Sequence, residues 1–256
     1  MATREEYDAI IIGASKSALF LAPALASAGR TALVEREYLG GVCVNVGCTP
    51  TKAMVASARV AQFARRAAEY GVHTGPVTVD LAAVRQRKRD LVSLVSAFPA
   101  GLIEQTEGLE LVMGEASFID SRSVEVRLKD GGLHQLSAER IIINTGARPS
   151  KPPIPGLDSV PTLDSTSIME LDTLPQHLLV LGGGYIGLEF SQMFRRFGSE
   201  VTVVHHGKQL LGREDPDVAE EVTKILREDG VQVVLDGETV KVDQSADGQV
   251  QLTVKT

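Results

Sequence analysis

The chain of 256 residues is poor in cysteine and in aromatic residues: it has two cysteines, no tryptophan, and only 4% Phe, Trp and Tyr together. Two cysteines are too few for the disulfide scaffold of a small secreted protein. The first residues, Met-Ala-Thr-Arg-Glu-Glu-Tyr-Asp, are polar and acidic, so we expect no secretory signal. These absences predict a cytoplasmic protein whose cysteine pair is redox-active or metal-binding.

Long hydrophobic runs and an excess of basic residues are also missing. The apolar runs are a few residues long, far short of the roughly 20 needed to span a bilayer. The formal net charge is -7, whereas a nucleic-acid surface needs clustered basic residues. The sequence therefore predicts neither a membrane nor a nucleic-acid partner. Its 43% hydrophobic content is that of a globular protein with one or two domains.

The N-terminal segment has the pattern of a βαβ unit. An apolar strand over 9–12 leads into a turn at Gly13, and a stretch of small and apolar residues up to Ala28 predicts a helix. A second apolar strand over 31–34 follows and ends on Glu35. An acidic residue about 20 positions beyond a glycine turn is typical of dinucleotide binding.

A second unit of the same kind contains the complete G-x-G-x-x-G pattern. Gly182, Gly184 and Gly187 stand between an apolar strand and a helical segment, and another strand follows. The first glycine permits a tight turn, the second lets the backbone approach a pyrophosphate, and the third permits close helix–strand packing. The helix N-terminus then offers unpaired N–H groups to the phosphates. Strand, helix and strand in this order make a dinucleotide site a strong prediction.

Each βαβ unit is followed by alternating residues that predict an antiparallel meander. The first meander covers 117–136, and a separate strand over 140–144 leads into T-G-A-R-P; the second covers 231–256, where the sequence stops. We therefore expect an α/β protein with two doubly wound, Rossmann-like domains, an FAD-binding domain at 1–150 and an incomplete NAD(P)-binding domain at 151–256. Because the second copy lacks the closing strand, we infer a truncated piece of a longer protein.

Helical sequence lies between the cysteines and the first meander. Residues 51–70 are rich in Ala and Arg, and residues 81–98 repeat apolar positions at helical spacing. The second of these segments contains the basic stretch R-Q-R-K-R at 85–89. We interpret this stretch as a solvated helix face, with a phosphate-binding or partner-binding patch as the alternative.

Cys43 and Cys48 are five positions apart in G-G-V-C-V-N-V-G-C-T-P-T-K. A metal site is one interpretation, but no further Cys pair or His cluster supplies the other ligands that zinc requires. A plain buried pair is another, although it does not explain the surrounding glycines. A redox pair explains more, because Pro50 places the cysteines near a helix N-terminus, which lowers the pKa of a thiol.

This segment resembles the active-site signature of the class I flavoprotein disulfide reductases, the family of dihydrolipoamide dehydrogenase, mercuric reductase and glutathione reductase. T-G-A-R-P at 145–149 and G-G-G-Y-I-G-L-E-F at 182–190 are similar to two further landmarks of the family, in the same order. The three motifs cover essentially the whole chain.

The resemblance implies a role for each matching residue. Cys43 would be the interchange thiol and Cys48 the thiol beside the flavin, while Lys52 would lie near flavin N5 with Glu189 as its ion-pair partner. Tyr185 would cover the nicotinamide pocket. The remaining residues expected at the cofactors are Gly13, Ser15, Ala18, Glu35, Gly41, Thr145 and Gly146 for FAD, and Gly182, Gly184, Gly187 and His205 for NAD(P)H.

Two positions depart from the family pattern. Ser15 stands where the first phosphate loop usually has glycine, and its Cβ lies where the backbone must approach the pyrophosphate. We predict that Ser15→Gly tightens FAD binding. His205 replaces the acid that selects NAD by binding the 2′-hydroxyl, so His205 and the neighbouring basic residues favour NADPH.

The resemblance implies an FAD-dependent NAD(P)H:disulfide oxidoreductase. Electrons would pass from NAD(P)H through FAD to a Cys43–Cys48 disulfide, and from there to a disulfide or a metal-ion acceptor. The full-length form is expected to be a homodimer. The family's C-terminal interface domain, which supplies a His–Glu acid–base pair, is not visible in this sequence. The alternative is therefore a truncated or degenerate nucleotide-binding paralogue without turnover.

Overall fold

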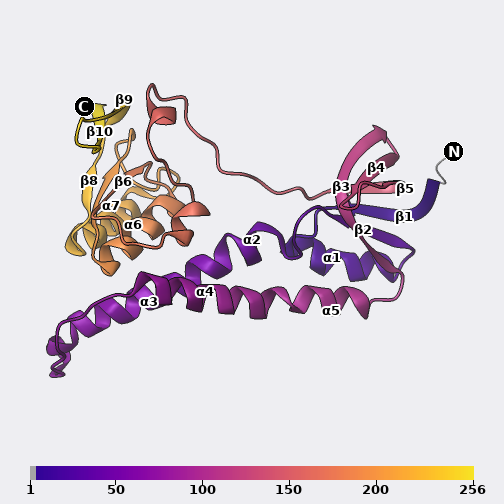
Figure 1. Cartoon of the computed structure of the whole chain (residues 1–256), viewed down its shortest axis with the longest axis horizontal. Helices are drawn as coiled ribbons and strands as arrows, with labels where there is room; N and C mark the ends of the chain where they lie inside the picture. The colour runs from indigo at the N-terminus through magenta and orange to yellow at the C-terminus, as the bar shows by residue number, and fades with distance from the viewer. Residues whose placement is uncertain (1–3) are drawn as a thin grey trace. The chain divides into compact units, whose positions relative to one another are not determined.

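A computed structural model describes residues 4–256, which form two compact units (Figure 1). The first unit contains the residues up to Thr51 together with Arg89–Arg148, and the second contains Lys52–Lys88 and Pro149–Thr256. The sequence placed residues 52–88 in the first domain. They group with the second unit because Met54, Ala58 and Leu81 are buried in its main hydrophobic core.

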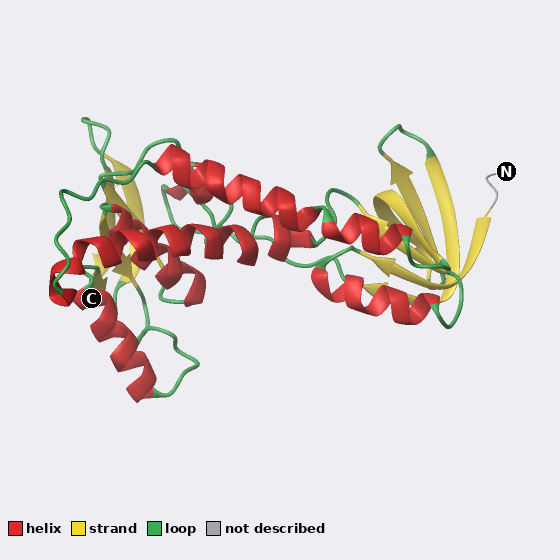
Figure 2. Cartoon of the chain, turned by 90° about the horizontal axis from the view of Figure 1, so that it is seen from below, coloured by secondary structure: helices red, strands yellow, loops and turns green. Residues whose placement is uncertain are grey.

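The first unit is built on five strands that close into a barrel in the order β1-β2-β3-β4-β5. β1 pairs in parallel with both β2 and β5, β2 pairs in parallel with β3, and β4 pairs antiparallel with β3 and β5. Figure 2 shows these strands in yellow with helices beside them. The bounds are β1 Arg4–Ile12, β2 Thr31–Glu35, β3 Leu109–Asp120, β4 Ser123–Leu128 and β5 Leu133–Ile143, with helices α1 Lys16–Ala26, α2 Gly41–Asn45 and α5 Phe98–Glu104.

One strand joins the meander to the parallel sheet. The sequence predicted separate strands for the meander and for residues 140–144, whereas β5 runs without interruption through both. Its first half is antiparallel to β4 and its remainder is parallel to β1, with Ile143 opposite Ile12. The α/β class and the Rossmann-like arrangement are confirmed, and the antiparallel meander β3-β4-β5 is continuous with the parallel strands.

Alternation along β1 divides the apolar residues of this unit between two cores. Ile10 faces the barrel interior, where it packs with Val34, Val124 and other buried residues. Ile11 faces the opposite way, toward the small residues of α1 and toward Ile103 of α5. Successive side chains of a strand point to opposite faces, so a short apolar strand can serve both layers.

The second unit has a three-stranded parallel sheet in the order β6-β7-β8 and a separate β9–β10 hairpin. Helix α6 covers the sheet with buried Phe190, Met193 and Phe194, in the same core as Val203 of β7. The bounds are β6 His177–Leu181, α6 Tyr185–Phe197, β7 Glu200–Val204, α7 Pro216–Glu228, β8 Gln232–Val234, β9 Glu238–Gln244 and β10 Val250–Lys255. Short 3-10 helices are η1 Ala67–Tyr70, η2 Leu157–Ser159 and η3 Ser167–Glu170.

The helical segments that the sequence predicted between the two βαβ units are present. α3 covers Cys48–Arg65 and α4 covers Leu81–Ser96, so each helix ends a few residues before the predicted limit. Between residues 4 and 256, no helix combines the length and the apolar content that crossing a membrane requires.

Two residues of the basic stretch of α4 are not solvated, whereas Gln86, Arg87 and Arg89 are exposed as expected. Lys88 is 3% exposed; it pairs with Glu170 and donates to the Met169 carbonyl at 3.1 Å. Arg85 pairs with Asp172 and donates to the Glu170 carbonyl at 3.0 Å. The interpretation of these two residues as solvated was wrong, because their long side chains reach η3 and fix this part of α4 to the second unit.

Candidate active site

The first phosphate loop begins at a glycine with a left-handed backbone. Gly13 has φ +102°, and a Cβ added there would collide with the Asn144 backbone carbonyl. The Gly13 N–H donates to the Val34 carbonyl at 2.7 Å, which ties the loop to the end of β2. Only glycine adopts this conformation without strain, so the predicted turn is present at the predicted residue.

Glu35 holds the loop from the end of β2. One carboxylate oxygen accepts the Ala14 N–H at 2.8 Å, and the other accepts the Glu37 N–H at 2.7 Å. The carboxylate is thereby fixed beside the loop, at the position where the sequence expected an acceptor for ribose hydroxyls. Binding of the ribose by Glu35 stays a prediction.

Ser15 occupies the position immediately before α1, with φ -68° and ψ 171°. This extended backbone is open to any residue, so serine is not strained there. Ala18 lies one turn into α1, where it is 2% exposed and packed in the core between helix and sheet. Ala18 therefore supports the close helix–strand packing that this position requires in the dinucleotide pattern.

The segment that carries the cysteines is hydrogen-bonded to the phosphate loop. The Gly40 N–H donates to the Ala14 carbonyl at 2.8 Å, and Ser15 and Gly40 form a parallel β-bridge. Gly41 has φ +59°, and a Cβ there would lie 3.0 Å from the Ser15 Cα. Two glycines in the left-handed region thus let the cysteine segment pass directly over the loop.

Cys43 lies in α2 and Cys48 is the first residue of α3; both are free thiols. Cys48 has the largest influence on the Cys43 thiol, so the structure brings the two side chains close together. The Cys48 hydrogen bond, then burial and the Cys48 charge, raise the pKa of the Cys43 thiol, and Lys16 partly opposes this. The sequence predicted a lowered thiol pKa from the helix N-terminus. For Cys43 in the reduced pair this was wrong, because the neighbouring sulfur dominates.

Thr145 and Gly146 lie just beyond Asn144, the residue that follows β5, and both are exposed. Gly146 has φ +70°, in the left-handed region that favours glycine, and a Cβ there would meet no protein atom within 4 Å. Asn144, the residue before them, was not singled out from the sequence. It contacts the phosphate loop with Nδ2, which donates to the Gly13 carbonyl at 2.9 Å.

The second phosphate loop reproduces the glycine pattern in detail. Gly182 has φ +104°, as the tight turn requires. A Cβ at Gly187 would lie 2.8 Å from the Gly182 carbonyl oxygen, so close helix–strand packing excludes a side chain there. A Cβ at Gly184, in contrast, would meet no protein atom within 4 Å. Gly184 thus leaves open the space that a pyrophosphate would fill.

That open space belongs to a cavity of about 520 Å³ in the second unit. The cavity is lined by the second phosphate loop and by the basic segment that follows β7. Tyr185 is 61% exposed at its edge and hydrogen-bonds to Glu214, whose carboxylate raises the pKa of the phenol. The lining residues are Gly183, Gly184, Tyr185, His205, His206, Gly207, Lys208, Gln209, Leu211, Gly212 and Arg213.

His205 is hydrogen-bonded to the second phosphate loop at the edge of this cavity. Its Nδ1 accepts the Gly183 N–H at 3.2 Å, which requires an unprotonated nitrogen. Burial and the charge of His206 lower the pKa of His205. A neutral ring that is already bonded to the loop is a poor phosphate ligand, so His206, Lys208 and Arg213 are the residues here that could meet a 2′-phosphate.

Lys52 and Glu189 form an ion pair within the second unit. Lys52 lies in α3, one helical turn after Cys48, and Glu189 lies in the second turn of α6. The side chains are 64% and 30% exposed. The structure therefore brings together the two residues that the family resemblance paired, while their role at a flavin stays a prediction.

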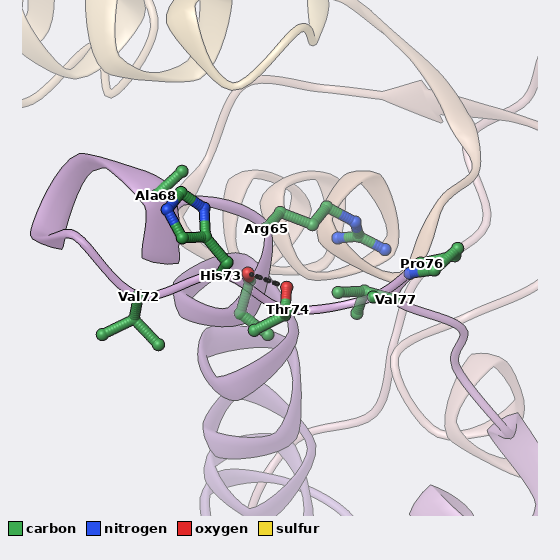
Figure 3. Close-up of a pocket in the computed structure, with 9 residues that line it drawn as sticks. Arg65, Ala68, Val72, His73, Thr74, Pro76 and Val77 are labelled. Carbon is green, nitrogen blue, oxygen red and sulfur yellow. Dashed lines mark hydrogen bonds between the residues drawn. The ribbon is translucent and has the colours of Figure 1, made fainter.

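A second pocket of about 380 Å³ lies at the turn after α3 (Figure 3). Thr74 Oγ1 donates to the Ala64 carbonyl at 3.1 Å, and Arg65 and His73 lie on opposite sides of the pocket (Figure 3). Its polar groups do not converge on one point, so the pocket is not a candidate active site. Among residues 4–256, no group of three or more His, Cys, Asp or Glu side chains could hold a metal ion.

Comparison with known proteins agrees with this geometry. Residues 7–256 match the family described as pyridine nucleotide-disulphide oxidoreductase, so the chain belongs to that family. The expected resemblance is thereby confirmed. The family implies a flavin and a pyridine nucleotide as cofactors.

Individual relatives share about a third or more of their aligned residues with the chain. Mercuric reductase of Bacillus cereus is 39% identical over 94% of this chain and 38% of its own length. The probable pyridine nucleotide-disulfide oxidoreductase RclA of Escherichia coli is 38% identical over 96% of this chain and 53% of its own length. A Cu(II) complex of the HOCl-induced flavoprotein disulfide reductase RclA from Escherichia coli aligns with a TM-score of 0.84 at 35% identity, over 98% of this chain and 54% of that chain. The chain spans about half the length of such relatives.

Proposed function

We propose that this chain contains the flavin and nicotinamide sites of an FAD-dependent NAD(P)H:disulfide oxidoreductase. One observation carries the proposal: the neighbouring thiols Cys43 and Cys48 follow a segment that is itself hydrogen-bonded to the first phosphate loop through Gly40. A redox pair must reach the flavin whose pyrophosphate the loop binds. The backbone bond between loop and cysteine segment supports that placement.

The residues present fit both cofactors. For FAD, Gly13 provides the turn, Glu35 is fixed beside the loop, and α1 directs its first N–H groups toward the phosphate position. For NAD(P)H, the space at Gly184 is open and the cavity of about 520 Å³ carries exposed His206, Lys208 and Arg213. These basic residues support NADPH over NADH.

Bound FAD would supply the chemistry that the side chains lack, accepting a hydride from the nicotinamide and passing two electrons to a disulfide. Two electrons and two protons convert a Cys43–Cys48 disulfide into the two thiols that the structure shows. The Cys43 thiolate would attack a substrate disulfide and release one substrate thiolate. Cys48 would then displace the second substrate thiolate and restore the internal disulfide. Lys52, held by Glu189, would contribute positive charge near the flavin.

The acceptor follows from the same pair of thiols. Two adjacent thiolates suit a disulfide substrate, and they also suit a soft metal ion, which prefers sulfur ligands. Relatives that carry the names mercuric reductase and dihydrolipoyl dehydrogenase span both classes. We propose a small disulfide or a metal ion as acceptor, a homodimer as the full-length form, and a cytoplasmic location.

The absorption spectrum of the purified chain tests the proposal. Reconstitution with FAD should give flavin bands in stoichiometric amount, and anaerobic reduction with NADPH should add a long-wavelength band from a thiolate beside the flavin. Cys48→Ser should remove that band and keep the flavin bands, whereas Cys43→Ser should keep both. A chain that stays colourless after incubation with FAD would instead support the non-catalytic paralogue.

A further inference from the structure

Ser15 stands at the N-cap of α1 but does not cap it. A serine at this position normally turns its hydroxyl toward the N–H of the second or third helical residue, here Ser17 or Ala18. The structure has no side-chain hydrogen bond from Ser15 to the helix backbone. The Ser15 hydroxyl therefore bonds to a group other than the helix backbone.

The partner is Asn144, at the end of β5. Asn144 Nδ2 donates to Ser15 Oγ at 2.7 Å, and Ser15 Oγ shares a hydrogen bond of 2.9 Å with Ser17 Oγ. Ser17 Oγ in turn donates to Asn144 Oδ1 at 3.3 Å, which closes a ring of three side chains. The Ser15 hydroxyl is thus bonded to the side chains of Asn144 and Ser17 and to no backbone N–H of the helix.

Asn144 is held in place independently of the serines. Its backbone N–H donates to the Ile12 carbonyl at 2.8 Å, and Nδ2 donates its other hydrogen to the Gly13 carbonyl at 2.9 Å. A carbonyl can only accept, so the amide nitrogen must face the loop. Both Nδ2 hydrogens are therefore assigned, one to the loop backbone and one to Ser15.

We propose that Asn144 is a positioning residue that prevents Ser15 from capping α1, so that the first N–H groups of the helix stay free for the diphosphate of a dinucleotide. This inference rests on the proposed FAD site. The N-terminal N–H groups of a helix have no partner within it, and they are the donors that bind phosphate. A capping serine would compete with the ligand for one of them.

The proposal explains how serine is tolerated where the pattern has glycine. Glycine brings no hydroxyl and so cannot cap through a side chain. Serine in the extended conformation at φ -68° fits the backbone but brings a competing acceptor. Because Asn144 binds the Ser15 hydroxyl, that hydroxyl does not compete with the diphosphate for the helix N–H groups. The effect of Ser15→Gly on FAD binding should therefore depend on whether Asn144 is present.

A double-mutant cycle on the whole chain tests this dependence. FAD dissociation constants are measured by quenching of flavin fluorescence for the wild type, Ser15→Gly, Asn144→Ala and the double variant. We expect Asn144→Ala to weaken binding about fivefold to tenfold, the range implied by one N-cap bond. Adding Ser15→Gly to Asn144→Ala should restore most of that loss, whereas Ser15→Gly alone should tighten FAD binding by less than about threefold.

A second measurement does not require FAD. Amide hydrogen exchange of the apoprotein, followed by NMR, reports whether the Ser17 and Ala18 N–H groups are bonded. We expect Asn144→Ala to slow their exchange and the double variant to return it to the wild-type rate. Ser27→Ala is the control, because Ser27 Oγ donates to the Ala24 carbonyl at 2.8 Å at the other end of α1. This variant should match the wild type in both measurements.

The outcomes separate the inference from the function on which it rests. If Asn144→Ala weakens FAD binding equally in the wild type and in the Ser15→Gly variant, the inference is overturned, since Asn144 would then act through Gly13 alone. Unchanged exchange at Ser17 and Ala18 would overturn it as well. If exchange follows the prediction while no variant, wild type included, binds FAD, the proposed function fails and the diphosphate role of Asn144 fails with it.

Discussion

Lys52 and Glu189 are 137 positions apart in the sequence and form an ion pair within the second unit. Their substitution should separate function from stability. Exposed ion pairs contribute at most about 1 kcal/mol, and these side chains are 64% and 30% exposed. Lys52→Met should therefore lower the free energy of unfolding by less than about 1 kcal/mol in urea denaturation, yet slow flavin reduction by NADPH about tenfold or more, as loss of one charge–charge contact at a reacting centre does.

Lys224→Met is the matched control, because Lys224 pairs with Glu221 on an exposed face of α7. It should leave both the unfolding free energy and the rate of flavin reduction unchanged. Glu189→Gln should resemble Lys52→Met. A wild-type reduction rate in Lys52→Met would remove the ion pair from the proposed mechanism.

The titration of the Cys43 thiol should depend on the presence of Cys48. Cys48 raises the pKa of Cys43 through its hydrogen bond and its charge, so Cys48→Ala should lower the pKa of Cys43. The reaction of reduced protein with iodoacetamide, followed by mass spectrometry at a series of pH values, reports the thiolate of Cys43. The midpoint of its pH–rate profile should move to lower pH in Cys48→Ala. An unchanged midpoint would mean that burial alone raises the pKa of Cys43.

Two glycines of the second phosphate loop should respond in opposite ways to the same substitution. A Cβ at Gly187 would lie 2.8 Å from the Gly182 carbonyl, so Gly187→Ala should lower the free energy of unfolding by about 1–3 kcal/mol. A Cβ at Gly184 would enter open space, and its φ of -87° suits alanine. Gly184→Ala should therefore fold with wild-type stability and bind NADPH about tenfold or more weakly.

Urea denaturation and calorimetric titration with NADPH measure the two effects. The comparison is informative because each variant serves as the control for the other. Wild-type nucleotide affinity in Gly184→Ala would show that the cavity does not receive the pyrophosphate.

His205 should make the stability of the chain depend on pH. Its pKa in the folded chain is lowered below the ordinary 6.5, first by burial and then by His206. The unfolded chain therefore takes up the proton first as the pH falls. The stabilising contribution of His205 is complete above pH 6.5 and is lost as the pH falls below that value.

His205→Asn tests this dependence, since an amide oxygen can accept the Gly183 N–H without titrating. Its free energy of unfolding should decline less than that of the wild type between about pH 7.5 and about pH 5, measured by urea denaturation. His205→Ala, which leaves the Gly183 N–H without this acceptor, should be less stable than the wild type by about 1–3 kcal/mol above pH 6.5, and this difference should narrow as the pH falls. Parallel declines in the wild type and His205→Asn would contradict the assignment.

The local pattern predicted the elements that carry the loops. Gly13 and Gly182 both adopt the left-handed backbone expected of a strand-to-helix turn, and each lies between the first strand and the helix of a βαβ unit. These features depend on neighbours in sequence, because a glycine followed by a small-residue helix specifies its own geometry. The pairing of Lys52 with Glu189 came from the resemblance, since no local rule joins residues so far apart.

Other features depend on contacts that local patterns do not encode. Ser137 and Glu139 interrupt the apolar pattern of β5, yet the strand continues because β1 pairs with it along its length. The sequence did not predict a role for Asn144, because its contacts with the phosphate loop depend on the parallel register of β5 and β1. Lys88 looked like a surface residue in a basic run, but its nitrogen reaches Glu170 and the Met169 carbonyl, 81 or more positions away.

The closed barrel of the first unit has a consequence for how this protein associates with others. In the part of the chain that the structure describes, every strand there pairs with two others, so none of them is an edge strand along its whole length. Within the described residues, β6 and β8 of the second unit each pair with β7 alone. An intermolecular β-sheet, whether in ordered assembly or in aggregation after partial unfolding, would therefore form more readily at β6 or β8 of the second unit than at the barrel of the first.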